Sequence, residues 1–192
     1  MAQAFAALIL AGGVGERFGG PKAFARLPDG ATFLERCLAV VRAAGADPVA
    51  ATLPPAAAGP SVEGLLALAL PAPGMDMLAS VRHGLNRLLE ATGWSVVVVL
   101  PVDHPLIRPE TVRVLAREAV PTAVPRYRGK RGHPVALARS FVEQLVSGTS
   151  APATLRDAMK AAGRRDVEVD DPGVVANCNT PEQLASALAH RE

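Results

Sequence analysis

The amino-acid sequence predicts a single α/β domain of three layers, α/β/α, in which helices cover both faces of a mostly parallel sheet. Apolar runs typical of strands alternate with amphipathic helical segments along the 192 residues, as in successive βαβ units. The run 94–100 contains four consecutive valines, which is typical of a strand buried on both faces. We find neither an internal repeat nor a domain boundary, so residues 1–192 are expected to form one domain.

The composition limits the classes of partner. Hydrophobic residues make up 49% of the chain and aromatic residues 4%, so we expect a core of Leu, Val and Ala. The net charge of +2 comes from mixed signs, which argues against a nucleic-acid surface. No apolar stretch approaches the ~20 residues of a membrane span, and no signal peptide is expected. Cys37 and Cys178 form neither a metal-binding nor a disulfide pattern. We therefore expect a cytoplasmic protein without a membrane partner.

In the first half of the chain, strands are expected at 5–10, 48–53 and 94–100. A capping box at Thr32 and Glu35 begins a helix that ends at Gly45. Residues 61–70 are predicted to form a short helix after a Pro/Ala loop. Asp76 is placed to cap a helix with apolar residues at helical spacing, which ends at Gly93.

In the second half, we expect helices at 109–119 and 141–146 and strands at 122–126, 134–138, 167–169 and 174–176. The segment 127–133 is predicted to be a basic loop. Ser150 or Thr154 opens a further helix that ends near Gly163. The sequence Thr-Pro-Glu-Gln at 180–183 predicts a second capping box, with proline at the first helical position.

The first predicted strand leads into a glycine-rich loop that has the features of an anion-binding site. Residues 8–22 read Leu-Ile-Leu-Ala-Gly-Gly-Val-Gly-Glu-Arg-Phe-Gly-Gly-Pro-Lys. Glycine allows positive φ and lets amide groups approach a ligand closely, and successive N–H groups form an anion-binding concavity. Arg17 and Lys22 add two cations. The loop therefore predicts binding of a nucleoside triphosphate.

Two better-known glycine loops do not fit this segment. A P-loop has glycine directly before Lys-Ser/Thr, whereas Pro21 precedes Lys22 here and Ala23 replaces the hydroxyl residue. The dinucleotide-binding fingerprint requires a third glycine at the position of Phe18.

Two further segments carry oxygen ligands suited to magnesium. Asp103 lies in Pro-Val-Asp-His-Pro directly after the valine-rich strand, and ligands bind at the carboxyl ends of strands in open α/β sheets. Mg²⁺ prefers one or two protein oxygens together with phosphate oxygens and water. Asn177 and Asn179 lie in Ala-Asn-Cys-Asn-Thr-Pro-Glu, and one of them is a candidate to complete the site; alternatively, both only terminate a strand. Between them, Cys178 is expected to face the core.

These three segments together resemble the MobA/MocA-like molybdenum-cofactor nucleotidyltransferases, in which they recur in the same order. The resemblance extends from Leu8 to Leu184. It implies a Rossmann-like nucleotidyltransferase fold and Mg²⁺-dependent transfer of NMP from GTP or CTP to a phosphorylated acceptor, with release of pyrophosphate. The implied acceptor is molybdopterin, which makes the product a molybdenum-cofactor dinucleotide. Transient contact with molybdoenzymes or cofactor-biosynthesis proteins is also implied.

The resemblance assigns roles to particular residues. Arg17, Lys22 and Asp103 are implied as catalytic, Asp103 and Asn177 as metal ligands with Asn179 as the alternative, and His133 of Gly-His-Pro as an acceptor contact. The implied nucleotide-binding residues are Leu10, Ala11, Gly12, Gly13, Val14, Gly15, Arg17, Lys22, Asp76, Ser80 and Asp103.

Several alternatives stay open from the sequence. Motifs typical of guanylyl and of cytidylyl enzymes occur together, so the nucleobase is undecided. A sugar phosphate or another small phosphate is an alternative acceptor, and a non-catalytic molybdenum-cofactor carrier is an alternative function. The basic side chains of Arg126, Arg128, Lys130 and Arg131 either screen an anionic acceptor or form only a solvated loop.

Overall fold

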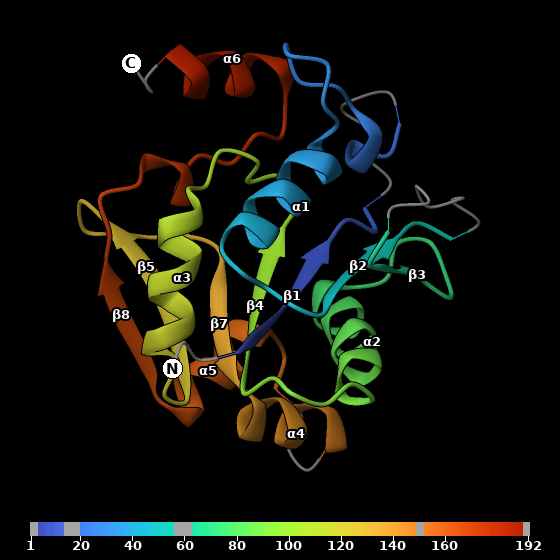
Figure 1. Ribbon diagram of the computed structural model, residues 1–192, viewed down its shortest axis with the longest axis vertical. Helices are drawn as coiled ribbons and strands as arrows, with labels where there is room; N and C mark the ends of the chain where they lie inside the picture. Colours follow the sequence, from blue (N-terminus) through green and yellow to red (C-terminus); the bar gives the residue numbers. More distant parts are fainter. Residues whose placement is uncertain (1–3, 14–19, 56–62, 149–151, 190–192) are drawn as a thin grey trace.

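The computed structural model describes residues 4–13, 20–55, 63–148 and 152–189. Within them, one mixed sheet has the strand order β3-β2-β1-β4-β7-β5-β6, and β8 pairs with β5 (Figure 1). The strands are β1 (Phe5–Leu10), β2 (Val49–Leu53), β3 (Leu65–Ala69), β4 (Val96–Pro101), β5 (Thr122–Tyr127), β6 (Lys130–Arg131), β7 (Val135–Ala138) and β8 (Arg164–Glu168). The strands from β3 to β4 are parallel to one another, whereas β7 runs antiparallel to β4 and β5.

Helices cover both faces of the sheet, which confirms the predicted fold class. They are α1 (Phe33–Ala43), α2 (Met77–Leu89), α3 (Pro109–Glu118), α4 (Arg139–Ser147), α5 (Leu155–Ala162) and α6 (Pro181–Ala189). Two short 3-10 helices, η2 (Lys22–Phe24) and η3 (Pro172–Val174), lie in the connections. Among the described residues, no helix combines the length and hydropathy needed to span a bilayer.

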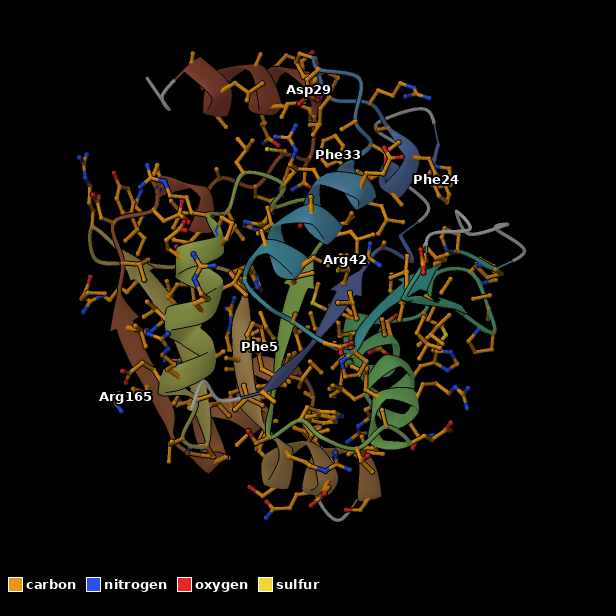
Figure 2. The ribbon with its side chains drawn as sticks, viewed as in Figure 1. Phe5, Phe24, Asp29, Phe33, Arg42 and Arg165 are labelled. Carbon is orange, nitrogen blue, oxygen red and sulfur yellow. The ribbon has the colours of Figure 1, made fainter. Side chains whose placement is uncertain are left out.

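Successive residues of the central strands pack into two separate hydrophobic layers, because side chains alternate between the faces of a sheet. In β1, Ala7 and Ile9 belong to the layer under α1 and α3, whereas Ala6 and Leu8 belong to the layer under α2, α4 and α5. Phe5 and Phe33 are buried in the first layer (Figure 2). The glycine loop after β1 and the segment after β4 therefore emerge side by side at the carboxyl edge of a rigid centre.

The structure confirms three of the predicted helix starts. Thr32 and Glu35 form the capping box of α1, the Asp76 side chain accepts from the amide of Ala79 at the start of α2, and Thr154 caps α5. The alternative start at Ser150 lies outside the described residues. At α6 the amide of Gln183 donates to the hydroxyl of Thr180, but the Gln183 side chain accepts from the amide of Asn179. The second capping box thus reaches back one residue further than predicted.

The predicted elements at 61–70, 167–169 and 174–176 require correction. Residues 65–69 form the edge strand β3, paired in parallel with β2, because the ladder of β2 overrides the weak helical pattern of this short apolar run. Strand β8 begins earlier, at Arg164, and pairs with β5. Near 174–176 the chain forms η3, whose turn is fixed by the Asp171 side chain accepting from the amide of Gly173.

Two further elements differ from their predicted bounds by a few residues. The first residues of α4 directly follow β7, so this helix starts at Arg139, two residues before the predicted position. The predicted basic loop 127–133 contains the two-residue strand β6, which turns back on β5.

Candidate functional site

A pocket of about 430 Å³ lies at the carboxyl ends of β1, β2 and β4. Its walls come from the glycine loop, the strand ends, the start of α2 and the segment after β4. The lining residues are Leu10, Gly12, Gly13, Lys22, Thr52, Gly74, Met75, Met77, Ser80, Pro101, Val102 and Asp103. This is the edge at which open α/β sheets bind their ligands. The structure thus brings together at one pocket many of the residues that the resemblance assigned to the nucleotide.

The described part of the glycine loop is open toward solvent. A Cβ atom at Gly13 would meet nothing within 4 Å, whereas one at Gly12 would lie 2.2 Å from Cδ1 of Leu70. Neither glycine is among the described residues with positive φ. Gly13 therefore leaves its side of the pocket free of a side chain, whereas Gly12 lets Leu70 pack closely against the loop. Val14, Gly15 and Arg17 lie outside the described residues, and Ala11 is buried.

Lys22 stands between the glycine loop and the predicted metal ligands. It is the first residue of η2, and its Nζ donates to Oδ1 of Asn179 at 2.5 Å. The same ammonium group lies 3.9 Å from Oδ2 of Asp103. One cation thus faces two oxygen-bearing side chains that are far from it in the sequence.

The carboxylate of Asp103 has one oxygen that forms no hydrogen bond within the described part of the chain. Its Oδ1 is buried and has no hydrogen-bond partner among the described residues. Its main-chain oxygen accepts from the amide of Cys178 at 2.8 Å. This bond draws the segment 177–179 against the end of β4. The position of Asp103 directly after a buried strand was predictable, but the contact with Cys178 was not.

These oxygens fit a hard divalent cation. Mg²⁺ or Mn²⁺ takes carboxylate and amide oxygens and completes its shell with phosphate and water. Asp103 supplies an unpartnered buried carboxylate oxygen, and Asn179, which shares Lys22 with it, supplies an amide oxygen. Asn177 is exposed. The described residues contain no cluster of three or more His, Cys, Asp or Glu side chains.

Cys178 is fully buried in the hydrophobic layer under α1, and burial raises the pKa of its thiol to about 11. Cys37 belongs to the same layer, and burial raises its pKa further. Both thiols are therefore protonated at pH 7 and act as core side chains. The prediction that Cys178 faces away from its asparagine neighbours agrees with this burial.

Two histidines adjoin the carboxylate of Asp103. Nε2 of His104 lies 3.9 Å from Oδ1 of Asp103, and the rings of His104 and His133 have centroids 5.0 Å apart. Burial lowers the pKa of both, that of His133 to about 4, so both rings are neutral at pH 7. Nδ1 of His133 is buried without a hydrogen-bond partner among the described residues. A neutral ring carries no charge to pair with an anionic acceptor substrate, but it can contact that substrate through hydrogen bonds.

Two of the four basic side chains of the β5–β6 hairpin pair with acidic residues of β8. Arg131 pairs with Asp166 through two hydrogen bonds, and Arg126 lies 3.4 Å from Glu168. Arg128 stacks its guanidinium over the ring of Tyr127. This arrangement favours the interpretation of the segment as a solvated structural hairpin.

Sequence reasoning missed Thr52, and it placed Asp76 closer to the pocket than the structure does. Thr52 is fully buried at the end of β2, lines the pocket and has a hydroxyl without a partner among the described residues. The available signal was a polar residue in an apolar strand. Asp76 is used to cap α2 and is not a lining residue, whereas Ser80 lines the pocket and donates to the main-chain oxygen of Asp76.

The geometry agrees with comparisons to known proteins. Residues 7–169 match the family model of the MobA-like NTP transferase domain. No curated protein sequence is significantly similar to the chain.

Solved structures share the fold over almost the full chain. The crystal structure of Rv0371c from Mycobacterium tuberculosis H37Rv has a TM-score of 0.80 and 25% identity, covering 97% of this chain and 98% of that chain. The complex of that protein with manganese has a TM-score of 0.74 and 24% identity, with coverage of 97% and 98%. The 2-C-methyl-D-erythritol 4-phosphate cytidylyltransferase from Thermus thermophilus has a TM-score of 0.69 and 23% identity, with coverage of 96% and 98%. The chain therefore belongs to the MobA-like NTP transferase family and is a nucleotidyltransferase.

Proposed function

We propose that this nucleotidyltransferase moves NMP from GTP or CTP onto a phosphate of molybdopterin, forming a molybdenum-cofactor dinucleotide and pyrophosphate. The observation that carries the proposal is the meeting of Lys22, Asp103 and Asn179 at the pocket. Together they offer a cation for phosphate oxygens and oxygen ligands for a divalent metal. The shared motif set favours molybdopterin as the acceptor.

In the proposed reaction, an oxygen of the acceptor phosphate attacks the α-phosphorus of the NTP. A new P–O bond forms as the bond from the α-phosphorus to the oxygen bridging to the β-phosphate breaks, and pyrophosphate leaves. The second pKa of a phosphate monoester is about 6, so the nucleophile is ionised at pH 7 and needs no general base. The neutral His104 and His133 are then free to position the acceptor through hydrogen bonds.

Catalysis rests on positioning and electrostatics. Gly13 leaves space for the phosphates, and Lys22 would donate to their oxygens. Asp103 and Asn179 would hold the divalent cation, which supplies positive charge to the reacting phosphates when bound. The manganese complex of Rv0371c supports a divalent metal in this fold.

We further propose that the base enters the pocket against Thr52 and Ser80. Both are buried hydroxyl residues on the pocket wall. The Thr52 hydroxyl has no other partner among the described residues, and it can donate or accept. It therefore suits either a guanine or a cytosine edge.

The test is pyrophosphate release from GTP and from CTP in turn, with molybdopterin and Mg²⁺. Release with one nucleotide, dependent on molybdopterin, supports the proposal and identifies the base. Release that occurs only with a sugar phosphate in place of molybdopterin would contradict the acceptor. Binding of molybdopterin without pyrophosphate release from either nucleotide would favour the alternative of a non-catalytic molybdenum-cofactor carrier.

A further inference from the structure

We propose that Lys22 acts as an internal competitor for the metal site: its ammonium group holds Asp103 and Asn179 until a triphosphate draws it away. Metal binding then depends on nucleotide. This inference rests on the proposed function, since it takes Asp103 and Asn179 as the metal ligands.

The ammonium group of Lys22 faces the two side chains that the metal would use. Its Nζ donates to the amide oxygen of Asn179 and lies 3.9 Å from the Asp103 carboxylate. The side chains of Lys22 and Asp103 are 14% and 22% exposed, so solvent screens the charges only in part. A divalent cation on the same oxygens would meet the positive charge of Lys22 at close range.

The position of Lys22 lets it exchange these partners for phosphate oxygens. It follows directly on the glycine loop, as the first residue of η2, and it lines the pocket together with Gly12 and Gly13. An ammonium group has three donors, and a triphosphate offers several charged acceptors. Movement of Nζ onto the phosphates would leave the oxygens of Asp103 and Asn179 to the metal.

The consequence is an order of binding. Without nucleotide, we expect the protein to bind divalent metal weakly, because Lys22 donates to the amide oxygen of Asn179 and keeps its positive charge 3.9 Å from the Asp103 carboxylate. With nucleotide, phosphate oxygens both remove Lys22 and complete the coordination shell. The enzyme would thereby avoid holding a metal in a site that contains no substrate.

The experiment measures Mn²⁺ binding without nucleotide, using electron paramagnetic resonance to quantify free Mn²⁺. Lys22→Met is expected to bind Mn²⁺ at least about tenfold more tightly than the wild type, because a like charge near the site is removed. Lys22→Arg keeps the charge and should bind as weakly as the wild type. Lys160→Met, on α5, is the matched control and should also behave like the wild type.

A double variant, Lys22→Met with Asp103→Asn, tests whether Mn²⁺ binds at this site. It should not show the higher Mn²⁺ affinity that is expected of Lys22→Met alone. Circular dichroism checks folding; if Lys22→Met is unfolded, Lys22→Gln replaces it, since it also removes the charge. Equal Mn²⁺ affinity in wild type and Lys22→Met, lost on Asp103→Asn, would overturn the inference and leave the proposed metal site standing. A gain that persists in the double variant would contradict both.

Discussion

The carboxylate of Asp171 joins the start of α3 to the turn of η3 through three hydrogen bonds, and its removal is expected to destabilise the fold strongly. It is 2% exposed. It accepts from the amide of Arg108 at 2.8 Å, from the hydroxyl of Thr111 at 2.7 Å and from the amide of Gly173 at 2.9 Å. The segment that it holds also bonds to the histidine loops, since the amide of His133 donates to the oxygen of Val174.

The magnitude follows from the three donors. Asp171→Ala leaves all three without their partner, and each buried unsatisfied donor costs about 1–3 kcal/mol. Because water can enter the space left by the carboxylate, we take the lower end and expect a loss of about 3–4 kcal/mol. Asp171→Asn keeps an acceptor for Gly173 and can donate to the hydroxyl of Thr111. It leaves the amide of Arg108 unsatisfied, so about 1–3 kcal/mol is expected.

Urea unfolding at pH 7, followed by circular dichroism, measures these losses. With a slope of about 2 kcal/mol per molar urea, Asp171→Ala should lower the midpoint by about 1.5–2 M, and Asp171→Asn by less. The exposed neighbour variant Asp170→Ala should leave the midpoint unchanged. A free energy of unfolding for Asp171→Ala within about 1 kcal/mol of the wild type would refute the argument that these three hydrogen bonds stabilise the fold.

Three further predictions concern the pocket, the packing and the acid response. Thr52→Val should raise KM for the nucleotide about five- to tenfold, as the loss of a hydrogen bond of ~1 kcal/mol would do, with an unchanged unfolding midpoint; an unchanged KM would exclude Thr52 as a base contact. Gly132→Ala should cost more than about 2 kcal/mol of stability, because its Cβ would lie 1.9 Å from the main-chain oxygen of Val174; unfolding at the wild-type midpoint would contradict this packing. Burial lowers the pKa of His133 to about 4 from its ordinary value of 6.5, so the unfolded chain binds the proton more strongly and stability falls as the pH drops from 6.5 to 4. Urea titrations at pH 7 and pH 5 measure this loss of stability, and His133→Gln should make it smaller. A loss between pH 7 and pH 5 equal to that of the wild type would contradict the prediction.

The central part of the fold could be predicted because its signals are local. The valine run of β4 is buried along its length, and the cap of α1 needs only residues within one turn. Asp103 could be placed for the same reason, since it follows a strand that is unmistakable in the sequence. The metal-binding role of Asp103, in contrast, was predicted only from the resemblance of the three motifs to the nucleotidyltransferases.

The strands at the edges could not be predicted because their partners decide their conformation. Strand β3 has an apolar sequence, and yet three of its five residues are exposed; its pairing with β2 makes it a strand. Strand β8 begins with polar residues, and Asp166 in it is held by Arg131 of the hairpin. Such ladders and ion pairs join segments far apart in the sequence and leave no periodic pattern.

Prediction of the site is limited in the same way, because its contacts join residues that are far apart in the sequence. Alternation along the chain separates Cys178 from its two neighbours but does not distinguish Asn177 from Asn179. The contact of Lys22 with Asn179 and the exposure of Asn177 are spatial observations, and they support the proposal of Asn179 as the ligand. Thr52 and Asp171 were missed because their importance comes from burial and from partners on other elements.

The measurement that bears most directly on the proposed mechanism is the steady-state rate of pyrophosphate release by Asp103→Asn. The substitution keeps the size of the side chain and removes the charge that would hold the metal. We expect kcat to fall by about 10²–10³, the cost of losing one electrostatic stabiliser of a transition state, with unchanged stability. Asp170→Asn, an exposed aspartate matched in chemistry, should retain the wild-type rate. A rate for Asp103→Asn above about a tenth of the wild type in saturating Mg²⁺ would contradict the assignment of Asp103 to the metal.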